Sequence, residues 1–136
     1  IAVFNMRDAF WPRVEALVQR LNQETDCCVT LHELTDTDTL QKELQKAQIL
    51  LNTTPVGMKN HPGCLIPSAD WLHPGLAVSD VIYEPRETEL LRMARAAGLQ
   101  AFNGLHMLLY QGAESFRLWT GCEMPVEQIR AEYFAE

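Results

Sequence analysis

The stretch QILLNTTPVGM, residues 48–58, joins a short apolar run to a loop of small polar residues, proline and glycine. The run is apolar on both faces, which is typical of a buried strand in a parallel sheet. In the loop, Asn52 and Thr53 can hydrogen-bond to neighbouring backbone and fix a turn, while Gly57 permits a close approach of the backbone. The segment therefore predicts a core strand that ends either in a shaped connection or in the wall of a binding cleft.

Segments with the patterns of strands and helices alternate along the whole chain. Strands are expected at residues 1–5, 27–34, 48–52, 76–82 and 99–103, and helices at 10–21, 35–47, 89–98, 104–121 and from Pro125. This alternation predicts an α/β fold with a mostly parallel sheet. The segment 104–121 is apolar almost all round, so we expect that helix to be heavily buried, including the amide of Gln111. Trp11, Trp71 and Trp119 are expected in the core or at its edge.

The composition limits the classes of partner and site. With 18 acidic against 11 basic residues, the chain has a net charge of -7, so we expect no nucleic-acid partner. No apolar stretch reaches the roughly 18 residues of a membrane-spanning helix, so we expect no membrane partner. The four Cys and four His show neither CxxC, HxH nor HExxH spacing, so we expect no metal site. A reducing, cytoplasmic location fits this cysteine usage best.

Ligands of parallel α/β sheets bind beyond the carboxyl ends of the strands, so the loops that follow strands are the candidate sites. In a dinucleotide-binding fold, the end of the second strand faces the adenosine ribose, and the sequence NMRD at 5–8 offers Arg7 and Asp8 there. A carboxylate can bind the ribose hydroxyls and repels a 2′-phosphate, whereas a guanidinium can bind that phosphate. The alternative interpretation is a solvated Arg–Asp pair at a strand end.

Four later residues could serve either the fold or a ligand. Tyr83 follows a strand and offers a flat ring with a polar tip, suited to a ring or a carboxylate, or it caps the edge of the core. Gly104 opens a helix, where backbone can approach a ligand closely. The amide of Gln111 could bond to the fold or to a polyhydroxylated substrate. Asp80 is weak evidence for acid–base chemistry, because no second carboxylate accompanies it.

Three ordered motifs resemble segments of a known enzyme family. They are NTTPVGM at 52–58, YEPRETELL at 83–91 and GLHMLLYQGAESFRLWTG at 104–121. They are similar to segments of the shikimate and quinate/shikimate dehydrogenases, and the resemblance covers nearly the whole chain from Asn5 onward. It implies that residues 1–136 are a three-layer, Rossmann-like NAD(P)-binding domain, truncated at its N-terminus so that its first βα unit is missing. It also implies reversible NAD(P)-dependent oxidation of shikimate or quinate to the 3-dehydro acid, within aromatic amino acid biosynthesis.

The resemblance assigns roles to residues by position. NAD or NADP would contact Asn5, Arg7 and Asp8 at the adenosine ribose, Thr53, Val56, Gly57 and Met58 near the nicotinamide, Val81, Ile82 and Tyr83 along the nicotinamide ribose, and Gly104. Tyr83 and Gln111 would contact the substrate. The family often has a second Arg where Met6 stands, so we expect NAD to be favoured over NADP. Pro55, Glu84 and His106 depart from the family pattern.

The family also has parts that find no match in this sequence. Its N-terminal domain carries a catalytic Lys–Asp pair, and a glycine-rich loop follows that binds the pyrophosphate. We therefore expect a fragment of a longer protein, with no catalytic residue of its own and inactive alone. The expected partners are shikimate or quinate as substrate and a second copy in a homodimer. The alternative function is a non-catalytic interaction or assembly module, which would have no affinity for a nucleotide.

Overall fold

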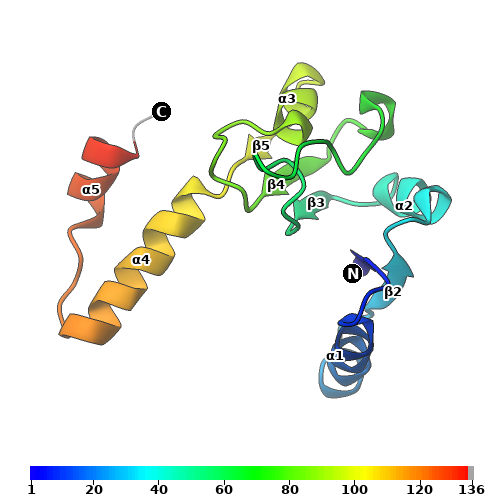
Figure 1. Cartoon of the computed structure of the whole chain (residues 1–136), viewed down its shortest axis with the longest axis horizontal. Helices are drawn as coiled ribbons and strands as arrows, with labels where there is room; N and C mark the ends of the chain where they lie inside the picture. Colours follow the sequence, from blue (N-terminus) through cyan, green and yellow to red (C-terminus); the bar gives the residue numbers. More distant parts are fainter. Residues whose placement is uncertain (135–136) are drawn as a thin grey trace. The chain divides into compact units, whose positions relative to one another are not determined.

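The protein's computed structural model describes residues 1–134, and the chain divides into two compact units, Ile1–Ala47 and from Gln48 onward (Figure 1). The first unit contains β1 (Ala2–Asn5), α1 (Trp11–Glu24), β2 (Thr30–Glu33) and α2 (Thr37–Leu44). The second contains β3 (Ile49–Asn52), a 3-10 helix η1 (Ala69–Trp71), β4 (Ala77–Asp80), α3 (Glu89–Ala96), β5 (Ala101–Phe102), α4 (Leu105–Thr120) and α5 (Val126–Tyr133). The predicted α/β class is confirmed, and each expected strand and helix is present.

In the first unit, β1 and β2 form a parallel pair in which Asn5 lies opposite Glu33. Helix α2 begins at a capping residue, because the Asp36 carboxylate accepts a hydrogen bond from the Thr39 amide at 3.0 Å. The buried apolar side chains of this unit are those of Val18, Val29, Leu40 and Leu44. Because the strands are parallel, the loop that follows β1 and the end of β2 lie at the same edge of the pair.

In the second unit, the strands form a three-stranded parallel sheet in the order β3-β4-β5. Val78 and Asp80 of β4 are buried on the face that α3 covers. Helix α3 presents Leu90, Leu91 and Ala94 to this face, all of them buried. Its first turn is capped by the Thr88 hydroxyl, which accepts a hydrogen bond from the Leu91 amide.

The opposite face of this sheet departs from the expectation that both faces of the strand at 48–52 are buried. The parallel register places Leu51, Ser79 and Phe102 in one row across the sheet. Leu51 and Phe102 are more than half exposed, as is Ile49. Within the described part of the second unit, α3 packs on the face that carries Val78 and Asp80. The apolar side chains of the face that carries Leu51 and Phe102 are left exposed.

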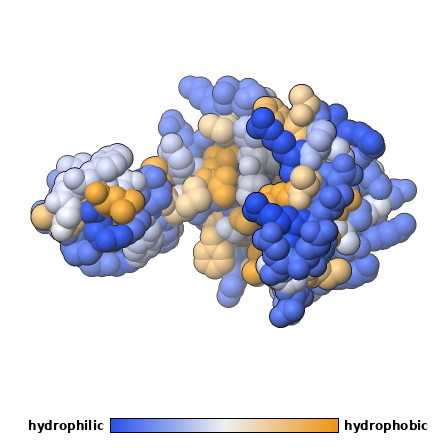
Figure 2. Space-filling view, turned by 90° about the horizontal axis from the view of Figure 1, so that it is seen from below, coloured by the Kyte–Doolittle hydropathy of each residue, from blue (hydrophilic) through white to orange (hydrophobic). Residues whose placement is uncertain are grey.

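The expected burial of the segment 104–121 is wrong. Of the residues of α4, Leu109 alone is buried, the Gln111 side chain is exposed, and Trp119 is 84% exposed. Helix α4 leads away from the sheet of its unit and packs against α5, so much of its apolar surface is left uncovered within the described part of that unit (Figure 1). Figure 2 shows a small hydrophobic patch amid neutral and hydrophilic residues on the lobe at the left, which α4 and α5 form.

None of the helices in residues 1–134 has the length and apolar character that a membrane span requires.

The core under α3 gives a direct test of the fold. Leu91 is fully buried, so Leu91→Ala should lower the free energy of unfolding by about 2–5 kcal/mol through lost burial and a residual cavity. Leu118→Ala is the matched control, because the same substitution at a 68% exposed position of α4 should change the free energy by less than about 0.5 kcal/mol. Urea unfolding monitored by circular dichroism measures the free energy of unfolding of both variants. Equal losses in the two variants would contradict the packing described.

Candidate functional site

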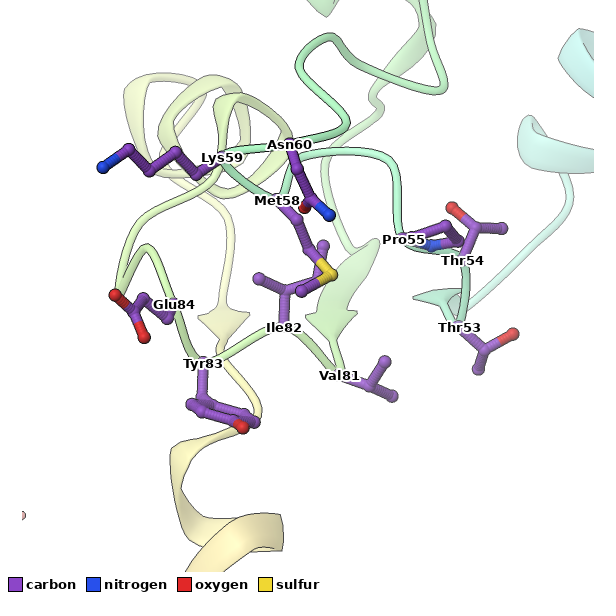
Figure 3. A pocket seen from close by; sticks show the side chains of 10 residues that line it. All are labelled: Thr53, Thr54, Pro55, Met58, Lys59, Asn60, Val81, Ile82, Tyr83 and Glu84. Carbon is purple, nitrogen blue, oxygen red and sulfur yellow. The ribbon is translucent and has the colours of Figure 1, made fainter.

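A pocket of about 380 Å³ opens beyond the carboxyl ends of β3 and β4. Figure 3 shows its lining, with residues of the loop after β3 on one side and residues of the turn after β4 on the other. The lining residues are Thr53, Thr54, Pro55, Met58, Lys59, Asn60, Val81, Ile82, Tyr83 and Glu84. The structure thus brings together five of the residues assigned to the nicotinamide side by the family resemblance.

The Asn52 side chain holds the loop after β3 in its turn. Its carbonyl oxygen accepts hydrogen bonds from the amide of Thr54 at 2.9 Å and from the Thr54 hydroxyl at 2.8 Å. Its NH₂ group donates to the carbonyl oxygen of Val56 at 3.0 Å. The sequence predicted that Asn52 and Thr53 fix this turn, but the second contributor is Thr54. Thr53 instead lines the pocket.

Asp80 does not line the pocket and is 1% exposed. One oxygen of its carboxylate accepts hydrogen bonds from the Asn52 NH₂ group at 3.1 Å and from the Ile82 amide at 3.0 Å. The other oxygen accepts a hydrogen bond from the Thr88 hydroxyl at 2.8 Å. Within residues 1–134, every buried side-chain nitrogen or oxygen has a hydrogen-bond partner. Asp80 is therefore an acceptor that three segments share, not a residue exposed to a ligand.

Two glycines allow segments around the pocket to approach closely. Gly57 has a φ of 110°, and a Cβ added there would lie 3.2 Å from the Thr88 side chain. Gly104 precedes α4, and a Cβ there would lie 1.9 Å from the carbonyl oxygen of Val81. The amide of Gly104 donates a hydrogen bond to the carbonyl oxygen of Ile82 at 2.9 Å. Helix α4 thus begins directly against the turn that lines the pocket.

Lys59 and Asn60 also line the pocket, although no motif in the sequence predicted them there. They occupy the tip of a turn in which the His61 amide donates to the Met58 carbonyl oxygen at 2.9 Å, and the Gly57 amide donates to the His61 carbonyl oxygen at 2.8 Å. In Figure 3 the Lys59 side chain points away from the other side chains. The only available signal was their position directly after the NTTPVGM motif.

Tyr83 and Gln111, which the resemblance assigns to the substrate, have different surroundings. Tyr83 lines the pocket and is partly exposed, so its ring is accessible to a ligand. Gln111 lies in α4 outside the lining of the pocket, and its NH₂ group donates to the carbonyl oxygen of Leu108 at 3.1 Å. The predicted buried amide is therefore an exposed one, and its assignment to the substrate stays a prediction.

In the first unit, the end of β1 carries a second candidate site at Asn5, Arg7 and Asp8. The Arg7 guanidinium forms an ion pair with the carboxylate of Glu33 and lies over the ring of Trp11, 5.4 Å from its centroid. The hydrogen bond and charge of Glu33 raise the pKa of Arg7 above its ordinary value. The Asp8 carboxylate accepts a hydrogen bond from the backbone amide two residues on, at 2.8 Å.

The alternative interpretation of residues 5–8 as an Arg–Asp pair is thus wrong in its partner, because Arg7 pairs with Glu33. Sequence reasoning missed Glu33. The signal that could have found it is the parallel register, which puts Glu33 opposite Asn5 at the carboxyl edge where Arg7 lies.

Comparison with known proteins finds relatives that match nearly the whole chain. Residues 104–132 match the model of the shikimate 5'-dehydrogenase C-terminal domain. Over 135 residues and 98% of its length, the chain is 45% identical to a shikimate dehydrogenase (NADP(+)) of Listeria monocytogenes. Over 131 residues, it is 44% identical to a quinate/shikimate dehydrogenase of Escherichia coli. The chain is thus related over nearly its whole length to about half of each of these dehydrogenases.

A solved structure supports the same relationship. The crystal structure of shikimate 5-dehydrogenase from Listeria monocytogenes, in complex with shikimate and NAD, superimposes with a TM-score of 0.89 at 44% identity. The superposition covers 97% of this chain and 46% of the Listeria chain. The chain likewise spans about half the length of the curated relatives it matches, 46% of both the Listeria and the Escherichia coli enzyme.

The close approach of Gly104 to Val81 predicts a sharp difference between two glycines next to or within α4. Gly104→Ala should lower the free energy of unfolding by roughly 1–3 kcal/mol, because the new methyl group forces the start of α4 away from the turn. Gly112→Ala meets no atom within 4 Å and should instead raise it by about 0.5–1 kcal/mol. Thermal unfolding of both variants checks this, and a neutral Gly104→Ala would contradict the contact.

Proposed function

We propose that this chain is the NAD(P)-binding domain of a shikimate/quinate dehydrogenase, which interconverts shikimate or quinate and the 3-dehydro acid. The observation that carries the proposal is the pocket at the carboxyl ends of β3 and β4, lined by residues of two of the motifs that resemble the family. When bound, NAD(P) would supply the hydride chemistry, and the chain would bind and orient it. The proposal places the enzyme in the cytoplasm and in aromatic amino acid biosynthesis.

The residues of the pocket fit the nicotinamide end of such a cofactor. A volume of about 380 Å³ suits part of a dinucleotide, since small-molecule sites are typically about 300–1,000 Å³. Met58, Val81 and Ile82 supply apolar surface for a flat ring, and Thr53 and Tyr83 supply hydroxyl groups for polar atoms. The names of the relatives support this class of ligand, because they specify NAD, NADP and shikimate.

The first unit supports NAD as the favoured cofactor. A 2′-phosphate at the end of β1 would need a guanidinium that is free to bind it, but the Arg7 guanidinium is paired with Glu33. The carboxylates of Glu33 and Asp8 would both repel the phosphate. The hydroxyls of an unphosphorylated ribose carry no charge and can donate hydrogen bonds to a carboxylate.

A calorimetric titration of the chain with NAD tests the proposal. We expect saturable binding to one site per chain, with a dissociation constant in the millimolar range or below, and weaker binding of NADP. We expect no hydride transfer to or from shikimate or quinate, because the family's catalytic Lys–Asp pair finds no match in these residues. Absence of binding for both dinucleotides would favour an interaction module, for which the exposed apolar side chains of α4, among them Tyr110 and Trp119, would be the surface.

The ion pair of Arg7 predicts how the choice between NAD and NADP can be changed. Glu33→Gln removes a negative charge and releases the guanidinium, so the ratio of NADP to NAD affinity should rise by about two- to fivefold. Glu43→Gln is the matched control, because Glu43 of α2 forms an ion pair with Lys46, which follows the helix. This variant should leave the ratio unchanged. An equal ratio in Glu33→Gln and the original protein would contradict the role given to the pair.

A further inference from the structure

We infer that Asp80 is a positioning residue of the pocket, whose buried carboxylate fixes the loop after β3 against the turn after β4. This inference rests on the proposed function for the identity of the ligand, NAD. It assigns Asp80 no contact with the ligand. Asp80 instead holds in place the two segments that line the pocket, through hydrogen bonds to Asn52 and Ile82.

The hydrogen bonds of Asp80 have a consistent direction. A carboxylate accepts and does not donate, so Asn52 must turn its NH₂ group toward Asp80 and its carbonyl oxygen toward Thr54. The Asn52 NH₂ group donates to both Asp80 and the carbonyl oxygen of Val56. These two hydrogen bonds restrict the backbone path of residues 52–56. The charge at position 80 thus determines the conformation of the loop through the orientation of one amide.

The same carboxylate determines the turn after β4. The Ile82 amide donates to it at 3.0 Å, which bends the chain out of the strand two residues beyond Asp80. The carbonyl oxygen of Ile82 then accepts the amide of Gly104, so the start of α4 depends on the same turn. Val81 and Ile82, which line the pocket, lie in this bend, and Tyr83, which also lines it, directly follows.

The third donor fixes the carboxylate itself. The Thr88 hydroxyl donates to Asp80 and accepts from the Leu91 amide as the cap of α3. Thr88 is also the side chain against which Gly57 packs. The three donors found among residues 1–134 are neutral, and burying a carboxylate is costly for stability. Apolar side chains would fill this space at lower cost, but they could not orient the Asn52 and Ile82 groups.

Asp80→Asn tests the inference because it keeps the shape of the side chain and replaces one acceptor by a donor. The dissociation constant for NAD should rise by about tenfold. If the new amide keeps its oxygen toward Asn52 and Ile82, its NH₂ group faces the Thr88 hydroxyl, which then loses the acceptor for its own proton. Asp70→Asn, the same change at an exposed aspartate of η1, should leave it unchanged. Amide hydrogen exchange of Thr54, Val56 and Ile82 should speed up in Asp80→Asn and not in Asp70→Asn.

A pair of variants at position 88 separates positioning from folding. Thr88→Val removes the hydroxyl and should weaken NAD binding as Asp80→Asn does, whereas Thr88→Ser keeps the hydroxyl and should recover most of the affinity. All variants are compared at a temperature at which circular dichroism shows them folded. Unchanged NAD affinity in folded Asp80→Asn and Thr88→Val would overturn the inference, with the proposed function intact. If the original chain binds no NAD, the proposed function fails, and unchanged hydrogen exchange in Asp80→Asn would then overturn the positioning role separately.

Discussion

The carboxylate of Asp80 is buried at the end of β4, where it accepts hydrogen bonds from Asn52, Ile82 and Thr88. Leaving such a group without donors in the interior costs more than most single interactions contribute. The three donors come from three separate segments, and the fold must bring all of them to one point. This requirement restricts the path of the chain after β3 and after β4, and the position at which α3 begins.

The pocket follows from this restriction. The side chains of Asn52, Asp80 and Thr88 are used in hydrogen bonds to one another, and none of them lines the pocket. Thr53, Met58, Val81, Ile82 and Tyr83 are among the residues that do. A rigid second set of residues that supports the residues in contact with a ligand is what precise binding requires. In the first unit, the ion pair of Arg7 and Glu33 has a comparable effect on a ligand. The Glu33 carboxylate offsets the positive charge that the Arg7 guanidinium would otherwise present.

The sequence was sufficient to predict the order of strands and helices, because hydrophobic periodicity and capping residues such as Asp36 act locally. It also grouped the motif residues that line the pocket, because parallel strands end at one edge. It failed where burial depends on what lies opposite. The apolar pattern of α4 and of Ile49 and Leu51 shows that a surface could be buried, but not whether any other segment covers it. The partner of Arg7 was missed for the related reason that it depends on the register of two strands.

In the proposed function, NAD binds with its nicotinamide end in the pocket beyond β3 and β4. Amide chemical shifts of the isotope-labelled chain, recorded during titration with NAD, test it most directly. The largest shifts are predicted at Thr53, Gly57, Met58, Val81, Tyr83 and Gly104, and they should saturate together with one dissociation constant. Absence of shifts, or shifts restricted to α5 and the end of α4, would contradict the claim.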